Sequence, residues 1–295
     1  MLDQELIQQI NRIEITAKHL VTDVFAGEYQ SVFKGRGMEF DEVRPYFPGD
    51  DVRRIDWNVT ARMAAPYVRR YQEERELTVM LLVDASGSSD FGTAGQFKRE
   101  LAAELAAVLS FAATANSDRV GLTIFTDKVE LMVPPKKGRR HILRMVRDLL
   151  VFQPENAGTD IGLALNTANL LLKQRSIIFL ISDFIAEPDS YRLALSSTAR
   201  RHDLIALDLH DPVEYEIPRV GVISLEDNET GEMVWVDTDS EDWRWSYGVG
   251  VAERQLEKIQ TMNSLGVDRI DLTTGQPYVA GLNEFFRRRA VRLYR

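Results

Sequence analysis

The sequence of 295 residues predicts an α/β fold with a doubly wound, mostly parallel sheet. Two runs, LTVMLLVD at 77–84 and SIIFLISD at 176–183, are apolar on both faces, as strands buried in a parallel sheet must be. Stretches with the apolar periodicity of helices follow both runs. Alternating strands and helices of this length are typical of doubly wound sheets.

The alternation occupies residues 76–295, which we expect to form the main domain. Further strands are expected at 119–125, 128–134, 203–209 and 267–273, and helices at 95–115, 141–151, 160–172, 189–200, 252–264 and 278–290. At about 213–248 an inserted β-hairpin is expected, with its turn near Asn228 and Gly231. The aromatic residues of DWRWSYG, at 242–248, are expected to pack on that hairpin.

Residues 1–75 have a different pattern. One face of a predicted helix at 3–24 carries the apolar residues Leu6, Ile10, Ile13, Ala17, Leu20 and Val21. The segment 25–75 then mixes aromatic and β-branched residues with Gly and Pro, which is typical of short strands joined by turns. Because the apolar residues are scattered, we expect residues 1–75 to form an appendage that packs on the core and does not fold alone.

The segment 40–62, FDEVRPYFPGDDVRRIDWNVTAR, combines charges with aromatic residues. Its acids Asp50, Asp51 and Asp56 alternate with Arg44, Arg53 and Arg54. This alternation suits an internal ion-pair network that orders the appendage as a strut. The same side chains could instead present a surface to a partner, and the sequence leaves both alternatives open.

The composition argues against several classes of function. The chain has no cysteine, which rules out disulfides, cysteine zinc sites and thiol nucleophiles. The net charge of −9 argues against non-specific binding to nucleic acid. No apolar run is long enough for a signal peptide or a bilayer span, so we expect a cytoplasmic protein without a transmembrane segment.

The loop after the first buried strand, in VMLLVDASGSSDFG at 79–92, carries Asp84, Ser86 and Ser88. Ligands of open α/β sheets gather at the carboxyl ends of the strands, so this loop is well placed for a site. A phosphate-binding loop would need a lysine after its glycines, and a serine-hydrolase elbow would need Gly-x-Ser-x-Gly. An aspartyl-phosphate enzyme would need a second carboxylate where Ser86 stands. The loop has none of these features.

Metal binding is the interpretation that remains. Oxygen atoms of Asp and Ser suit a hard cation such as Mg²⁺. Two other loops at strand ends offer more oxygens, since NAGTDIGLAL contains Thr159 and IIFLISDF contains Asp183. Thr159 alone could be a helix cap and Asp183 alone a strand end, but their combination with the first loop favours a single metal site.

In their order along alternating strands and helices, these five residues resemble the metal-ion-dependent adhesion site of von Willebrand factor A domains. This resemblance covers roughly residues 76–290. The segment 40–62, followed by that site, is similar to the bacterial family called domain of unknown function 58, whose members are often encoded beside MoxR-type AAA+ ATPases. The resemblance implies a von Willebrand factor A-like fold and such an ATPase as partner.

The resemblance also implies the roles of the site residues. Ser86, Ser88 and Thr159 would bind Mg²⁺, or Mn²⁺ or Ca²⁺, directly, while Asp84 and Asp183 would often act through water. An ion with few charged ligands stays electron-poor, so it can take an aspartate or glutamate of a partner protein as its last ligand.

The leading hypothesis is therefore a non-enzymatic, metal-dependent protein-interaction module. By the family resemblance it would be an adaptor for a MoxR-type ATPase in protein assembly or remodelling. The alternative is a metal-dependent hydrolase in which Asp84 and Asp183 hold an activating ion. A scaffold with an empty site is a third hypothesis. The lack of a general base near the loops in the sequence favours binding over hydrolysis.

Overall fold

The computed structural model describes residues 4–21, 27, 29, 32–33, 38–63, 65–73, 76–226 and 231–293. The chain divides into two compact units. The smaller unit is Phe33–Leu77, and the larger unit combines Met1–Val32 with Thr78–Arg295. Helix α1 (Gln4–Leu20) thus groups with the α/β core, whereas the sequence had suggested grouping it with the segment that follows.

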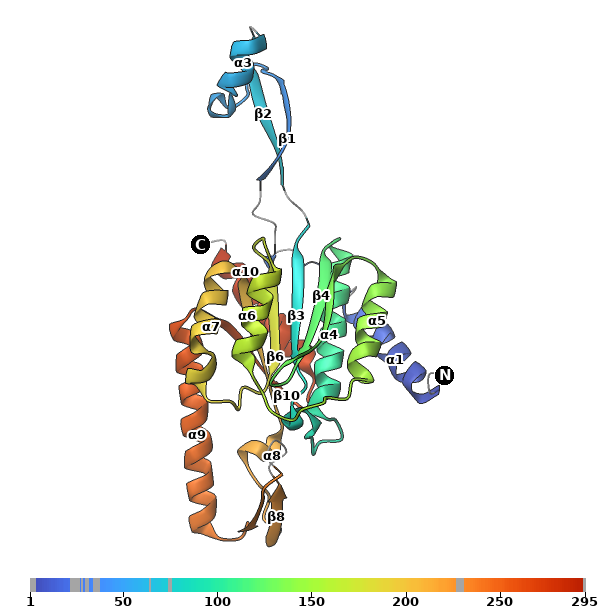
Figure 1. Cartoon of the computed structure of the whole chain (residues 1–295), viewed down its shortest axis with the longest axis vertical. Helices are drawn as coiled ribbons and strands as arrows, with labels where there is room; N and C mark the ends of the chain where they lie inside the picture. The colour runs from blue at the N-terminus through green and yellow to red at the C-terminus, as the bar shows by residue number, and fades with distance from the viewer. Residues whose placement is uncertain are drawn as a thin grey trace. The chain divides into compact units, whose positions relative to one another are not determined.

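The larger unit is built on a six-stranded sheet with the strand order β10-β7-β6-β3-β4-β5 (Figure 1). Its strands are β3 (Thr78–Asp84), β4 (Arg119–Phe125), β5 (Val129–Lys136), β6 (Ile177–Ser182), β7 (Asp203–His210) and β10 (Asp268–Thr273). Neighbouring strands are parallel except for β4 and β5, which are antiparallel. The predicted fold class, α/β with a doubly wound and mostly parallel sheet, is confirmed.

Helices cover both faces of this sheet. They are α4 (Lys98–Ala115), α5 (Arg139–Leu150), α6 (Ile161–Leu171), α7 (Pro188–Arg201), α9 (Glu241–Ser264) and α10 (Tyr278–Leu293). On one face, Met80 and Leu82 share a core cluster with residues of α6 and α7. The alternate residues Val79 and Leu81 are fully buried as well, so the opposite face is also covered. This burial on both faces explains why β3 is apolar along its whole length.

Helix α1 packs beside α4 and α5. The apolar face predicted from the sequence is buried at Ile13 and Ala17. Between these two residues, the carboxylate of Glu14 accepts two hydrogen bonds from the guanidinium of Arg139 in α5, at 2.5 and 2.9 Å. The predicted helix end at residues 22–24 lies outside the described residues.

An insertion separates β7 from α9. It consists of the short helix α8 (Pro212–Tyr215) and the antiparallel hairpin of β8 (Val222–Glu226) and β9 (Met233–Asp237). The inserted hairpin predicted from the sequence is therefore confirmed. Gly231, one of the two predicted turn residues, has a φ of 72°, the left-handed conformation that favours glycine. The other, Asn228, lies outside the described residues.

The extent of the insertion differs from the prediction, because residues 242–248 belong to helix α9 and not to the hairpin. Ser240 caps this helix by accepting a hydrogen bond from the backbone N–H of Trp243, and two acids occupy its first turn, which is favourable at a helix N-terminus. The rings of Trp243 and Tyr247 stack one helical turn apart, with their centroids separated by 5.3 Å. The aromatic cluster is thus a feature of the helix surface.

The smaller unit contains an antiparallel pair of strands, β1 (Met38–Pro45) and β2 (Tyr67–Glu73). Between them lie the single turn η2 (Val52–Arg54) and helix α3 (Trp57–Met63). Arg44 and Asp50 form one of the predicted ion pairs, through two hydrogen bonds of 2.8 Å. Asp51 and Asp56 accept hydrogen bonds from backbone N–H groups at the starts of η2 and α3.

Candidate metal centre

The centre begins where the adjacent parallel strands β3 and β6 end. Val83 pairs with Ile181, so the next residues, Asp84 and Ser182, also lie opposite each other. The hydroxyl of Ser182 donates a hydrogen bond of 2.6 Å to Oδ2 of Asp84. The other carboxylate oxygen, Oδ1, accepts from the backbone N–H of Ser86 at 3.0 Å. These bonds fix the orientation of the buried Asp84 carboxylate.

Ser88 lies in the tight turn η3 (Gly87–Asp90) that follows β3, and Ser86 is the residue that precedes this turn. Ser86 is only 1% exposed, and its Oγ lies 3.1 Å from Oγ of Ser88. The turn therefore brings the two serine hydroxyls together just beyond Asp84, as the predicted site requires.

Thr159 lies in the loop that leads into α6. A hydrogen bond of 2.8 Å from the backbone N–H of Gly87 to the carbonyl of Ala157 ties this loop to the serine turn. The helix cap of α6 is Asp160, whose side chain accepts from the backbone N–H of Leu163 at 2.7 Å. Capping is therefore the role of Asp160, and the alternative interpretation of Thr159 as the cap is wrong.

Asp183 follows β6 and is buried. Its Oδ2 accepts a hydrogen bond of 2.8 Å from Nζ of Lys98, and its Oδ1 accepts one of 3.2 Å from the backbone N–H of Ile185. A cavity of about 10 Å³ is lined by both aspartates, Ser88 and Lys98, among others. This space is about the size of a single water molecule.

The electrostatics of this cavity favour a cation. Burial, together with the nearby charge of Asp183, raises the pKa of Asp84 to about 6, even though Ser182 and Ser86 donate hydrogen bonds to it. Within the described part of the chain, no group of three or more His, Cys, Asp or Glu residues is placed to hold a metal. The donor set consists of hydroxyls and two buried carboxylates. Such oxygen ligands fit a hard cation such as Mg²⁺.

The sequence did not predict Lys98 and Glu214. The Lys98 ammonium, with its side chain only 2% exposed, contacts the carboxylates of both Asp183 and Glu214. Burial alone would lower the pKa of Lys98, but the two carboxylates outweigh this effect and raise it, so the ammonium stays charged. One signal was present, since Lys98 falls three and four residues before Leu101 and Ala102 on the buried face of α4.

Glu214 reaches the centre from α8 in the insertion. It forms a capping box with Asp211, whose backbone N–H donates to the Glu214 carboxylate at 2.8 Å. The Asp211 carboxylate in turn accepts hydrogen bonds from the side chains of Thr93, which follows the serine turn, and Thr274, which follows β10. The insertion is therefore attached firmly beside the candidate centre.

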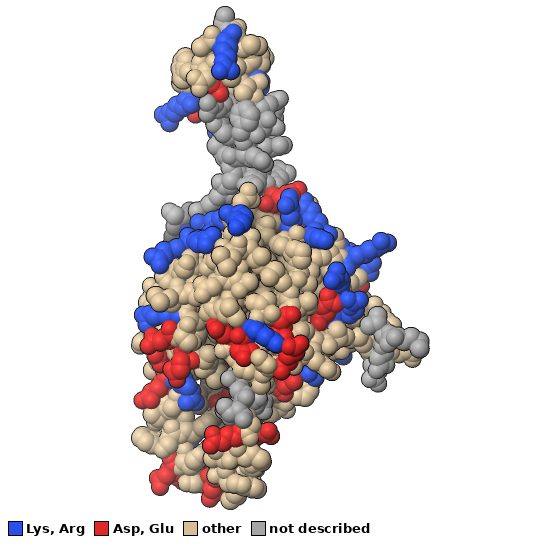
Figure 2. Space-filling view, in the orientation of Figure 1, with Lys and Arg blue, Asp and Glu red and all other residues tan. Residues whose placement is uncertain are grey.

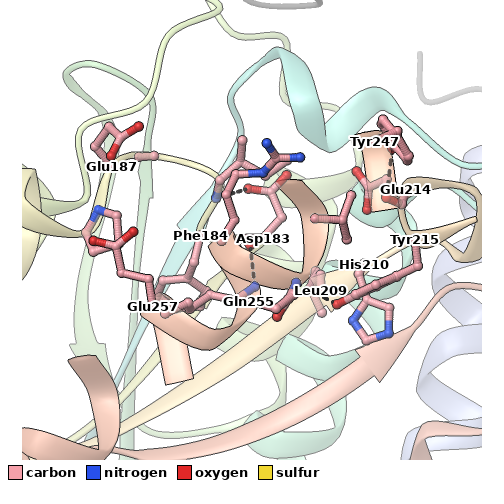
Figure 3. Close-up of a pocket in the computed structure, with 16 residues that line it drawn as sticks. Asp183, Phe184, Glu187, Leu209, His210, Glu214, Tyr215, Tyr247, Gln255 and Glu257 are labelled. Atoms are coloured by element: carbon pink, nitrogen blue, oxygen red, sulfur yellow. Dashed lines mark hydrogen bonds between the residues drawn. The ribbon is translucent and has the colours of Figure 1, made fainter. Parts of the chain in front are cut away.

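A larger pocket of about 340 Å³ opens next to the centre (Figure 3). Asp183 and Glu214 belong to both regions, because they line this pocket and also contact Lys98. The rings of Phe184, Tyr215 and Tyr247 also line it. This mixture of aromatic and charged side chains is typical of sites that bind a ligand or a partner's side chain.

Charge is unevenly distributed over the larger unit. In the view of Figure 2, acidic side chains gather over the end of the sheet where the parallel strands finish, and Lys and Arg are concentrated at the opposite end. Such a distribution favours cations at the end that carries the candidate centre.

A family model described as "Protein of unknown function DUF58" matches residues 42–257. The chain belongs to this family. All five candidate ligands lie within the matched range, as do Lys98 and Glu214. The uncharacterized proteins Mb1516 of Mycobacterium bovis and Rv1480 of Mycobacterium tuberculosis are each 33% identical to this DUF58 chain over 285 residues, which is 96% of the chain and 89% of the relative.

Two solved structures show a more distant likeness. The conserved hypothetical protein BatB from Bacteroides thetaiotaomicron aligns with 73% of this chain and 99% of its own, at 16% identity and a TM-score of 0.49. The SpRpn10 VWA domain aligns with 72% of this chain and 94% of its own, at 12% identity and a TM-score of 0.40. Among the residues described, none of the helices is both long and apolar enough to cross a membrane.

Proposed function

We propose that this DUF58 protein is a metal-dependent protein-interaction module and not an enzyme. Ser86, Ser88 and Thr159 would bind Mg²⁺, Mn²⁺ or Ca²⁺ directly, with Asp84 and Asp183 supporting the ion, and a partner's Asp or Glu would complete its ligands. The observation that carries this proposal is the convergence of the serine hydroxyls and two buried carboxylates where β3 and β6 end.

The lining of the small cavity supports binding over catalysis. A hydrolase that used Asp84 and Asp183 to hold an ion would also need a general base to activate water. Lys98 lines the small cavity, but it is a charged ammonium paired with two carboxylates. It therefore has no lone pair with which to accept a proton as a general base. His210 lines the neighbouring pocket, where its Nε2 lies 2.7 Å from Oγ1 of Thr273. Metal-dependent hydrolysis of phosphoester or peptide substrates, lost in Asp84→Ala, would favour the hydrolase instead.

The partner that we propose is a MoxR-type AAA+ ATPase, with this protein as its cytoplasmic adaptor in the assembly or remodelling of a third protein. Membership of the DUF58 family supports this choice. The 340 Å³ pocket offers a recess beside the ion in which a docking side chain could be buried. Its aromatic walls are typical of the anchor sites at protein interfaces.

The test measures the affinity for the purified ATPase in Mg²⁺, with Ser86→Ala compared with the wild type. Loss of the hydroxyl ligand is expected to weaken binding by about 2 kcal/mol or more, as when a buried charged contact is lost. Both proteins are measured in Mg²⁺, because a chelator would also remove the metal from the nucleotide of the ATPase.

Ser196→Ala serves as the control, since it removes a hydroxyl from α7 that lines neither the small cavity nor the neighbouring pocket and is not a proposed ligand. Its affinity for the ATPase should equal that of the wild type, and both variants should keep the wild-type melting temperature. Equal binding by Ser86→Ala and the wild type would show that the partner surface lies elsewhere on the molecule, for example on the segment 40–62.

A further inference from the structure

Lys98 is a buried cation inside the candidate metal centre. Its side chain is 2% exposed, and its Nζ lies 2.8 Å from Oδ2 of Asp183 and also contacts the Glu214 carboxylate. The same side chain lines the 10 Å³ cavity together with Asp84 and Ser88. An ammonium therefore already occupies part of the space around the carboxylates that would hold a metal ion.

The charges of this group do not balance. The carboxylates of Asp84, Asp183 and Glu214 contribute three negative charges when ionised, and Lys98 contributes one positive charge. Two negative charges remain, which is the deficit that one divalent cation would neutralise. Without Lys98 the deficit would be three, in a region where Asp84 and Asp183 are both less than one-tenth exposed.

We infer that Lys98 is the resident cation of the centre and that it has two effects. It stabilises the fold while no metal is bound, because it compensates carboxylates that would otherwise repel one another in the interior. It also lowers the affinity of the centre for a divalent cation, because two like charges then share a small buried space. The second effect rests on the proposed metal site.

This inference also gives the insertion a role. Lys98 is shared between Asp183 of the core and Glu214 of α8, and Glu214 is held in place by its capping box with Asp211. The position of α8 therefore determines how strongly the Lys98 ammonium interacts with the Asp183 carboxylate. A purely structural lysine would stabilise the fold to the same extent but would leave the cation affinity unchanged.

The experiment replaces Lys98 by Met in the full chain and uses Mn²⁺ alone as the probe. In EDTA, Lys98→Met should melt about 10 °C below the wild type, as expected when one partner of a buried ion pair is removed. Calorimetric titration should show Mn²⁺ binding about tenfold or more tighter than in the wild type. Mn²⁺ should therefore raise the melting temperature of the variant more than that of the wild type.

Arg289→Met is the matched control. Arg289 is a largely buried cation, with its side chain 13% exposed, that lies 3.0 Å from Oδ2 of Asp268 and also contacts Asp203 at the opposite end of the sheet. Its loss should lower the melting temperature in EDTA similarly but leave the affinity for Mn²⁺ unchanged. Glu214→Gln should change the Mn²⁺ affinity in the opposite direction, because it removes one negative charge and leaves Asp183 as the ion-pair partner of Lys98. Its Mn²⁺ affinity should fall below that of the wild type.

Equal Mn²⁺ affinity in Lys98→Met and the wild type would overturn the inference. If the wild type binds no Mn²⁺ and Lys98→Met binds it, Lys98 replaces the metal entirely. The resident-cation inference then stands and the proposed metal-dependent function fails. If Lys98→Met does not fold in EDTA, millimolar Mn²⁺ should restore folding, and failure to do so would also overturn the inference.

Discussion

Two ion clusters, each built around a buried carboxylate, lie at the carboxyl-terminal side of the central sheet, and they differ in charge balance. In the first, which we call the balanced cluster, Asp208 accepts hydrogen bonds of 2.9 Å from both Lys258 and Arg269. Arg269 also lies 2.7 Å from Asp271. Two carboxylates thus meet two cations, and the cluster needs no external ion.

The second, which we call the site cluster, consists of Asp84, Asp183, Glu214 and Lys98. Three carboxylates share one cation in the described contacts. The difference shows that burial of charge on this sheet does not by itself indicate a binding site. The balanced cluster satisfies its own charges and serves the fold, whereas the site cluster retains a deficit that a ligand could satisfy.

The two clusters are neighbours in the sheet. Ser182 of β6 pairs in register with Asp208 of β7, which pairs with Asp271 of β10. On its other side, the Ser182 hydroxyl donates a hydrogen bond to the carboxylate of Asp84 in β3. A single row of residues across four strands therefore runs from the site cluster to the balanced cluster. Lys258 of the balanced cluster also donates a hydrogen bond of 3.3 Å to the backbone carbonyl of Asp183.

The largest effect is expected from breaking the balanced cluster with Asp208→Asn. This change leaves the buried ammonium of Lys258 without its carboxylate and should lower the free energy of unfolding by about 3 kcal/mol or more. Because Lys258 contacts the site cluster only at the backbone carbonyl of Asp183, the charges of its three carboxylates and of Lys98 are unchanged, and the loss should be the same in EDTA and in Mn²⁺. Urea denaturation under both conditions measures it, and a loss that Mn²⁺ reverses would show that the two clusters bind a cation together.

A smaller effect is expected from Asp183→Ala in the site cluster. Repulsion between Asp84 and Asp183 alone would predict that this substitution stabilises the metal-free protein. The structure predicts the opposite, because Asp183 is an ion-pair partner of Lys98, while Glu214 remains as the second partner. We expect the free energy of unfolding in EDTA to fall by about 1–2 kcal/mol. This is less than the loss expected when a buried charge is left with no ion-pair partner.

Asp183→Ala should gain no stability from Mn²⁺. Asp208→Asn, in contrast, should gain as much stability from Mn²⁺ as the wild type does. Urea denaturation with and without Mn²⁺ compares the two variants directly. A gain in stability for Asp183→Ala in EDTA would mean that carboxylate repulsion exceeds the attraction of Lys98, and the charge count of the site cluster would need revision.

Much of the fold could be predicted from the sequence, and so could two residues of the site cluster, Asp84 and Asp183. The strand ends at Asp84 and Ser182 were predictable because buried parallel strands are apolar on both faces, so the first polar residue marks the end. The shared site followed from the rule that ligands collect at the carboxyl ends of such strands.

The contacts of Lys98 could not be predicted in the same way. Asp183 lies 85 residues from Lys98 in the sequence and Glu214 lies 116 residues away, and only the packing of α4 and α8 on the sheet brings the three together. Helix α9 begins well before the predicted helix at 252–264 and continues through the glycines at 248 and 250. Its start is set by the Ser240 cap, and its packing outweighs the low helix propensity of glycine.

The smallest effect is expected from His202, a buried neutral side chain at the opposite end of the sheet from the two ion clusters. His202 precedes β7, is 2% exposed, and accepts a hydrogen bond of 3.3 Å at Nδ1 from the backbone N–H of Ser176. Its Nε2 has no hydrogen-bond partner in the described structure. Burial, and then the charges of Arg201 and Arg175, lower the pKa of His202 below its ordinary value of 6.5.

Because the unfolded chain binds this proton more readily than the folded chain, the contribution of His202 to stability is complete above pH 6.5 and is lost as the pH falls below that value. We expect a loss of at most about 1.4 kcal/mol for each unit that separates the two pKa values. His202→Asn keeps an acceptor for Ser176 but cannot be protonated, so its stability should fall less between pH 7 and pH 5. Urea denaturation at these two pH values compares the variant with the wild type. Parallel pH dependence in both proteins would show that His202 is not the group that titrates, and that acid destabilises the fold through the charged clusters at the other end of the sheet.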